Sequence, residues 1–216
     1  MYLSAILIRR NDNMEKQLII SLGREFGSGG HVIAQKLAER YQIPLYDRDL
    51  LEKIASEKNI NSDDFEKYDE KRRNPFLTRT VRGYSNSPEE NIARMQFDFI
   101  KRKAAAGDSF VIVGRCAETI LKENPYMISI FVLGDMEQKI IRTMECNNIS
   151  RDKANKMIQQ NDRKRKEYHN YYCERKWGDS RNYDLSINSS KLGLEETTRI
   201  VIEYIDSRYN LNSQAL

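Results

Sequence analysis

The stretch Gly23-Arg24-Glu25-Phe26-Gly27-Ser28-Gly29-Gly30-His31 decides the fold. It lies between an apolar run at residues 18–22 and a helical pattern at residues 32–40. A strand, a glycine-rich turn and the start of a helix form the layout that holds a phosphate group, because backbone N–H groups and the helix dipole face the anion. The sequence therefore predicts a phosphate-binding turn in this stretch.

The turn departs from the usual phosphate-loop pattern GxxxxGK[ST]. When Gly29 is aligned with the second glycine, Arg24 takes the place of the first glycine, Gly30 that of the lysine and His31 that of the Ser or Thr. The lysine charge and the hydroxyl for magnesium are therefore missing. Arg24 can supply the charge, because a guanidinium binds phosphate through two N–H groups. The alternative is a tight strand-to-helix turn without a ligand.

The residues that we expect to hold the phosphates follow one another along this turn. They are Gly27, Ser28, Gly29, Gly30 and His31. The glycines allow the backbone N–H groups to turn inward around an anion. His31 offers one hydrogen bond when it is neutral and a positive charge when it is protonated, or it only caps the turn.

Composition indicates a charged globular protein. The chain has 216 residues, of which 39% are hydrophobic and 31% are charged, so it is long enough to bury a core. The net charge of +4 suits a site for polyanions such as nucleotides but is too small to indicate a nucleic-acid-binding protein. No apolar stretch approaches the about 20 residues of a membrane helix. We expect a cytoplasmic protein without a membrane partner.

The chain reads as one domain, residues 14–216, preceded by an appendage at residues 1–13. The first residues are apolar but lack the pattern of a signal peptide, and the first strand follows soon after Met14. Residues 58–88 are polar and are interrupted by Pro75 and Pro88, which is typical of an insertion that covers a substrate.

Strands and helices alternate along the domain. Strands are predicted at residues 18–22, 43–47, 110–114, 128–133 and 183–188, and helices at residues 32–40, 49–57, 88–106, 136–146, 151–172 and 194–209. This order predicts an α/β fold, with a parallel sheet covered by helices on both faces. Ligands bind beyond the carboxyl ends of such strands. The glycine turn, Asp47-Arg48, Gly114-Arg115 and the start of the basic helix should therefore meet at one rim.

The cysteines and His169 carry no obvious chemistry in the sequence. Cys116, Cys146 and Cys173 are far apart and form no CxxC pair, which favours free thiols and argues against a zinc site. Cys116 is interpreted as a small buried filler. His169 has no evident partner, so we expect it to be exposed.

Five motifs occur in a fixed order. They are Ser21–His31 with residues 33–38, then residues 43–48, residues 111–117, residues 162–165 with Tyr171-Tyr172, and residues 177–179 with residues 183–188. Over about residues 15–205 the chain thereby resembles the cytidylate kinase-like family, relatives of the nucleoside monophosphate kinases. The resemblance implies a three-layer P-loop kinase fold with a five-stranded parallel sheet, a helical substrate-binding insertion and a lid at about residues 150–180. It also implies ATP and Mg²⁺ as cofactors and a nucleoside monophosphate such as CMP or dCMP as substrate.

The resemblance assigns arginines to the reaction. Arg115 matches the arginine of a glycine–arginine pair, which implies contact with the substrate monophosphate or the transferring phosphoryl group. Arg163 and Arg165 match the lid arginines, which implies that they stabilise charge on that group. Together with Arg24, these are the candidate catalytic residues. A basic run such as residues 151–166 is otherwise most often a solvated helix face.

Further candidates line the expected substrate side. Asp47 follows the second strand, where it lies near substrate or metal or else caps the next helix. Arg48 and Arg82 are expected to contact the substrate phosphate. Asp162 is expected to orient Arg163 or to hold magnesium through water. The metal ligands themselves are not identified.

Three functions stay open at this point. The first is ATP-dependent phosphoryl transfer to a nucleoside monophosphate, which makes the chain a kinase. The second is a catalytically impaired, nucleotide-binding regulatory protein, because Gly30 stands where the lysine should be. The third is a kinase of another small molecule, because the acceptor would be chosen by the insertion, whose sequence gives no pattern.

Overall fold

A computed structural model describes residues 16–47, 49–58, 80–81, 84–85 and 87–209. In chain order its elements are β1 (Ile19–Arg24), α1 (Gly30–Tyr41), β2 (Leu45–Tyr46), α2 (Leu50–Lys58), β3 (Thr80–Val81), β4 (Tyr84–Ser85), α3 (Pro88–Ala105), β5 (Phe110–Val113), α4 (Ala117–Ile120), β6 (Met127–Leu133), α5 (Met136–Asn147), α6 (Arg151–Tyr172), the 3₁₀ turn η2 (Ser180–Asn182), β7 (Leu185–Asn188) and α7 (Ser189–Tyr209).

Five of these strands form one parallel sheet in the order β2-β5-β1-β6-β7. In the register, Ile20 of β1 lies between Val111 of β5 and Ile128 of β6. The predicted five-stranded parallel sheet is confirmed. Because β1 is the central strand, the glycine turn that follows it lies at the middle of the rim formed by the carboxyl ends of the strands.

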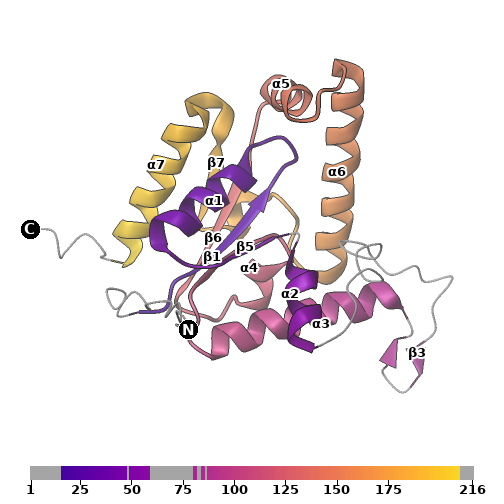
Figure 1. The fold of residues 1–216 in the computed structure, drawn as a ribbon, viewed down its shortest axis with the longest axis vertical. Coiled ribbons are helices and arrows are strands. Elements are labelled where there is room, and N and C mark those ends of the chain that lie inside the picture. Colours follow the sequence, from indigo (N-terminus) through magenta and orange to yellow (C-terminus); the bar gives the residue numbers. More distant parts are fainter. Residues whose placement is uncertain (1–15, 48, 59–79, 82–83, 86, 210–216) are drawn as a thin grey trace, which may run out of the picture.

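Helices cover both faces of the sheet (Figure 1). Side chains alternate along a strand, so Ile20 and Leu22 pack under α1 and α7, while Ile19 and Ile112 pack against α2 and α3. Both clusters are fully apolar and buried, which explains why the central strands read as continuous apolar runs. The three layers therefore hold β1 rigidly and present its end to the site.

The arm formed by α5 and α6 completes the molecule beside this rim (Figure 1). The two helices pack through Ile140 of α5 and Ala154 and Ile158 of α6, and Phe26 of the glycine turn packs against the same cluster. This contact brings the basic helix α6 to the glycine turn.

Several predicted boundaries shift, and the second strand shortens from residues 43–47 to Leu45–Tyr46. The last strand begins at Leu185 rather than at residue 183, and the carboxylate of Asp184 accepts hydrogen bonds from the backbone N–H and the hydroxyl of Ser129. The last helix begins at Ser189 and is interrupted at Gly193 (φ 76°), so the predicted helix is the part after the kink. Of the expected insertion, the structure describes the antiparallel pair β3–β4 and residues 87–88. Residues 1–13 lie outside the described residues.

Within the described part of the chain, no helix combines the length and the apolar character needed to cross a membrane.

Candidate active site

The glycine turn has a backbone that only glycine fits. Gly27 (φ 76°) and Gly29 (φ 81°) adopt left-handed conformations, and Gly29 is the N-cap of α1. A Cβ on Gly27 would lie 2.9 Å from the carbonyl oxygen of Lys139, and one on Gly29 would collide with Leu194. The turn is thus closely enclosed by α5 on one side and α7 on the other.

Neighbouring elements bind the carbonyls of the turn. Arg142 of α5 donates to the carbonyl of Gly27 at 2.6 Å, and Ser189 of α7 donates to that of Ser28 at 2.5 Å. The hydroxyl of Ser28 donates to the carbonyl of Glu25 at 2.9 Å, and Ser28 is completely buried. The side chain of Ser28 therefore holds the turn in shape. Its backbone N–H and carbonyl are bonded to Glu25 and Ser189, and Ser28 does not line the cavity beside the turn, so its expected contact with a phosphate stays a prediction.

The structure explains why no lysine stands at position 30. A Cβ on Gly30 would lie 2.6 Å from Cβ and 3.2 Å from Cγ of Arg24. These atoms are close to the Arg24 backbone and cannot move away as a flexible chain end could. Arg24 thus fills the space that a side chain at position 30 would need, and it is the cation beside the turn.

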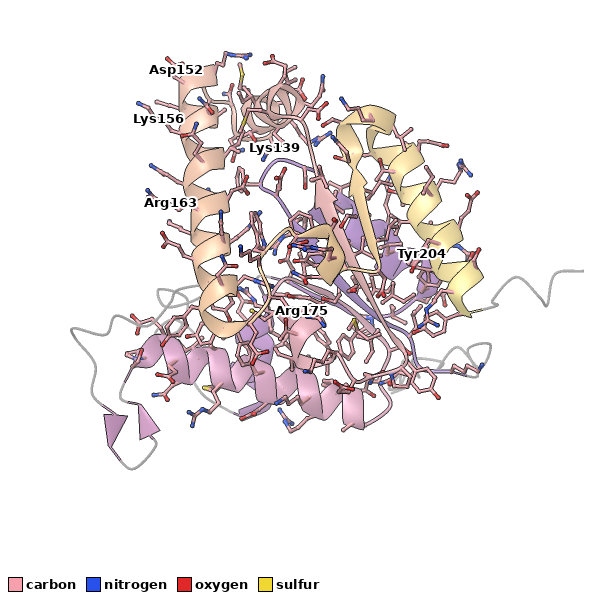
Figure 2. All side chains as sticks on the ribbon, turned by 180° about the vertical axis from the view of Figure 1, so that it is seen from behind. Lys139, Asp152, Lys156, Arg163, Arg175 and Tyr204 are labelled. Atoms are coloured by element: carbon pink, nitrogen blue, oxygen red, sulfur yellow. The ribbon has the colours of Figure 1, made fainter. Side chains whose placement is uncertain are left out.

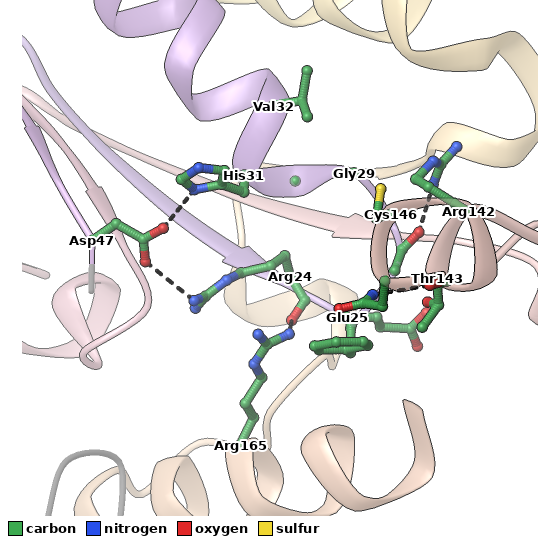
Figure 3. A pocket seen from close by; sticks show the side chains of 14 residues that line it. Arg24, Glu25, Gly29, His31, Val32, Asp47, Arg142, Thr143, Cys146 and Arg165 are labelled. Carbon is green, nitrogen blue, oxygen red and sulfur yellow. Dashed lines mark hydrogen bonds and ion pairs between the residues drawn. The ribbon is translucent and has the colours of Figure 1, made fainter. Parts of the chain in front are cut away.

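Asp47 connects the side chains of Arg24 and His31 (Figure 3). Its Oδ1 lies 3.4 Å from Nη2 of Arg24, and its Oδ2 lies 2.6 Å from Nδ1 of His31. Arg24 and Asp47 are buried, whereas the His31 side chain is 53% exposed. The carboxylate therefore serves the turn rather than capping α2. The backbone N–H of Asp47 donates a hydrogen bond to the side chain of Asp49, at 3.3 Å.

A cavity of about 290 Å³ opens beside the turn. Its cations come from three elements, Arg24 of β1, Arg142 of α5 and Arg165 of α6, and Glu25 and Asp47 supply carboxylates (Figure 3). Arg165 donates to the carbonyl of Arg24 at 3.3 Å. Gly27, Gly29, Gly30 and His31 also line the cavity. Three guanidinium groups and a helix N-terminus around one cavity form a site for a polyanion.

Arg115 lies in a second, smaller pocket beside this cavity. Arg24 and Arg165 line both spaces, and Trp177 lines the smaller one with Arg115. Arg115 is buried, and its Nη2 lies 3.5 Å from the carbonyl of Asp47. The predicted meeting of the glycine turn, Asp47 and Arg115 at one rim is therefore observed. The basic helix reaches them through Arg165 in its second half, and not through its start as predicted.

Arg163 is placed differently from Arg165. The two residues are about 200° apart around the helix axis, since each residue turns an α-helix by about 100°. Arg163 is exposed and extends away from the sheet (Figure 2). The structure therefore brings Arg165, and not Arg163, to the turn. Arg48 and Arg82 lie outside the described residues.

Sequence reasoning missed Lys139 and Arg142 on α5. Nζ of the buried Lys139 lies 3.1 Å from Oε2 of Glu25 and 2.8 Å from Oδ2 of Asp162. The other oxygen of Asp162 accepts the N–H of Phe26 at 2.6 Å. We call Glu25, Lys139 and Asp162 the loop clamp. Asp162 was expected to orient Arg163 or to hold magnesium through water. In the structure its carboxylate connects α6 to the glycine turn through Phe26 and Lys139.

A signal for these two residues was present in the sequence. They are three positions apart in a predicted helix that follows the third long apolar strand, so they share one helix face near the rim. The sequence did not show which face of that helix meets the turn.

The prediction for His169 is wrong, because this side chain is buried. Its Nε2 lies 2.6 Å from Oε1 of Glu118 on α4. Burial disfavours the charged imidazole, but hydrogen bonds with Cys173 and Glu118 outweigh it and raise the pKa of His169 to about 10.

A hydrogen bond with Cys116, helped by His169 and Thr119, lowers the pKa of Cys173 to about 6 despite its burial. The three cysteines, all of which the structure describes, form no disulfide, and Cys116 is buried as expected.

The family follows from a match over most of the chain. Residues 19–191 match the model of the cytidylate kinase-like family. The chain belongs to the cytidylate kinase-like family. A cytidylate kinase from Methanocaldococcus jannaschii is 27% identical over 194 residues, which cover 88% of this chain and 98% of that protein. The resemblance found in the motifs is thereby confirmed.

Solved structures agree with this fold. An uncharacterized protein from Eubacterium ventriosum is 44% identical, with a TM-score of 0.71 over 88% of this chain and 99% of that chain. A shikimate kinase from Bacteroides thetaiotaomicron is 13% identical, with a TM-score of 0.52 over 88% of this chain and 98% of that chain, and this likeness concerns the fold alone. Family and fold together support a phosphotransferase of the nucleotide or small-molecule kinase type.

Proposed function

We propose that this protein transfers the γ-phosphoryl group of ATP to a nucleoside monophosphate, with CMP or dCMP as the preferred acceptor. The observation that carries the proposal is the cavity at the glycine turn, which three arginines line. Phosphoryl transfer depends mainly on positioning and on neutralising the charge of the phosphates. In this chain arginines supply the charge that a loop lysine supplies in the usual pattern.

Each group has a role in this proposal. The N–H groups at the start of α1 hold the phosphates of ATP, and Arg24 stands in for the lysine because it occupies the space over Gly30. Arg165 stabilises charge on the transferring group from the side of α6. Arg115, in the adjoining pocket, binds the acceptor phosphate, and Arg48 and Arg82 are proposed to join it.

The residues present also fit magnesium. Asp47 and Glu25 line the cavity, and carboxylate oxygens are the ligands that Mg²⁺ prefers. They would hold the ion in place of the missing hydroxyl by sharing or exchanging their present contacts with Arg24 and Lys139. When bound with ATP, Mg²⁺ supplies neutralisation of the phosphate charge.

The test is an acceptor screen. ATP consumption is measured with CMP, dCMP, UMP, AMP and GMP, and the diphosphate product is identified by ion-exchange chromatography. We expect turnover with CMP or dCMP that is lost in Arg24→Ala. Binding of ATP without turnover of any acceptor contradicts the kinase proposal.

One observation favours a second candidate, a nucleotide-binding regulatory protein without turnover. Gly30 replaces the lysine, and Arg24 is paired with Asp47. This candidate predicts that ATP binds and that Arg165→Ala changes no rate, because there is none to change. Turnover with a phosphate-free acceptor alone would instead indicate a small-molecule kinase of another specificity.

A further inference from the structure

A second cluster of reactive side chains lies away from the phosphate cavity, between α4 and the end of α6. Glu118 comes from α4, His169 from the last turn of α6, and Cys173 is the C-cap of that helix. One ligand atom of each lies within 4.8 Å of the others, and all three residues are buried. Cys116, the N-cap of α4, forms a hydrogen bond with Cys173 through its thiol. We call these four residues the distal cluster.

The donor atoms are those of a zinc site. Zn²⁺ is bound by cysteine sulfur, histidine nitrogen and carboxylate oxygen, with four protein ligands in structural sites. Two thiols favour zinc over magnesium or calcium, which prefer oxygen. Ligands bound to one zinc ion at 2.0–2.3 Å lie roughly 3–4 Å apart. Glu118, His169 and Cys173, within 4.8 Å of one another, are therefore one small side-chain adjustment from sharing an ion. Cys116, in the same buried cluster as Cys173, would move toward them to complete a tetrahedral set.

The surroundings match those of a closed metal site. Ala93 and Tyr168 pack against both thiols and form an apolar wall. The hydroxyl of Ser21 lies 3.5 Å from the second carboxylate oxygen of Glu118, behind the oxygen that faces His169. Hydrogen bonds of this kind, made to the side of a ligand that faces away from the metal, fix the ligand's orientation.

The charges also balance. Two thiolates and one carboxylate carry three negative charges, of which a zinc ion neutralises two. Arg115 is buried next to Cys116 in the chain, and it lines the same small pocket as Cys116, Glu118 and His169. Its positive charge in the shared pocket offsets part of the remaining negative charge, besides its proposed role toward the acceptor phosphate. A buried carboxylate and two thiolates are otherwise costly to hold together.

We propose that Cys116, Glu118, His169 and Cys173 form a structural zinc site that fastens the end of α6 to α4. The sequence spacing argued against such a site, because no CxxC pair is present. The fold assembles it instead from the ends of two helices, with ligands 51 positions apart between Glu118 and His169.

The experiment measures metal directly. The full chain is produced in zinc-supplemented medium, purified without chelators under reducing conditions, and analysed for bound zinc by mass spectrometry of the metal. We expect one zinc per chain. Replacement by Co²⁺ should give sulfur-to-cobalt charge-transfer absorption and the strong visible bands of a tetrahedral site.

Matched cysteine variants place the site. Cys173→Ser should weaken zinc affinity at least about 100-fold, measured by competition with a chromophoric chelator. Cys146→Ser, which changes an exposed cysteine on α5, should keep the wild-type affinity. His169→Gln serves as a second variant, and circular dichroism identifies any variant that does not fold.

Several results would overturn the site. They are a reduced wild-type chain that holds no stoichiometric zinc or cobalt, equal affinity in Cys173→Ser and Cys146→Ser, or a Cys116–Cys173 disulfide in place of bound metal. Phosphoryl transfer is not the readout, so the zinc site and the proposed kinase activity fail or succeed separately.

Discussion

The helix α6 is fastened to the body of the protein at two places, and the two fastenings differ in chemistry. Asp162, Arg165 and His169 are spaced by three and four residues, so they share one face of the helix. At the first place, the loop clamp joins the carboxylates of Glu25 and Asp162 to the ammonium group of Lys139. At the second, the distal cluster joins a carboxylate, an imidazole and two thiols.

The two places also differ in their access to solvent. In the loop clamp, the side chains of Glu25 and Asp162 are 27% and 18% exposed, and the clamp borders the phosphate cavity. In the distal cluster, the side chains of Glu118 and His169 are only 5% and 7% exposed. The difference teaches that one helix serves two purposes. The clamp end lies at the cavity and is partly exposed, and the distal end is buried against α4.

Lys139→Met tests the clamp and should have the largest effect. It removes an ammonium that is 4% exposed and leaves two carboxylates facing each other. We expect the free energy of unfolding to fall by about 3 kcal/mol, measured by urea denaturation. The control is Lys191→Met, which breaks the exposed pair with Asp135 and should change nothing measurable. Equal stability of the two variants would show that the clamp fastens nothing.

Arg165→Ala separates fastening from catalysis. We expect kcat to fall by about 10²–10³, because the arginine on the cavity side of α6 is lost. Lys166→Ala, which changes an exposed neighbour, should keep the wild-type rate. Arg163→Ala should cost much less than Arg165→Ala, since its side chain is exposed. If Arg163→Ala costs as much, the orientation of α6 during turnover differs from the one described.

Gly30→Lys tests whether the arginine arrangement can be exchanged for the usual loop lysine. The new side chain would meet Cβ of Arg24, so we expect a loss of about 1–3 kcal/mol in unfolding free energy and no gain in kcat. Gln35→Lys adds the same residue on the exposed side of α1 and is the control. A more active Gly30→Lys enzyme would mean that Arg24 does not replace the lysine.

Ser189→Ala should have the smallest effect. It removes the hydroxyl that holds the carbonyl of Ser28 from the side of α7, opposite the clamp. We expect a loss of about 1 kcal/mol in thermal or urea unfolding, with Ser207→Ala as an exposed control. A larger loss than that of Lys139→Met would mean that α7, and not α6, fixes the turn.

The sheet was predictable because its central strands are buried on both faces. The apolar runs at residues 18–22, 110–113 and 128–133 have no other reading that fits their length and their glycine ends. A parallel sheet places all carboxyl ends at one edge, so the meeting of Arg24, Asp47 and Arg115 followed from topology alone.

The two fastenings were not predictable, for a physical reason. The partners of Lys139 are 114 and 23 positions away, and His169 binds a carboxylate 51 positions away. Local patterns show that a helix has a polar side but not which residues of another helix complete it. His169 has no evident partner in the sequence, which suggested exposure, and only its contact with Glu118 of α4 shows that it is buried.

The turn after β5 limits substitution at two neighbouring positions independently of their chemistry. Gly114 (φ 77°), Arg115 (φ 60°) and Cys116 (φ 56°) are all left-handed, a conformation that side chains rarely adopt in succession. Valine, isoleucine and threonine are strained in this region, so position 115 or 116 would reject them even if it had no ligand to bind. Asparagine is tolerated there, which makes Arg115→Asn a gentler removal of the guanidinium than Arg115→Val.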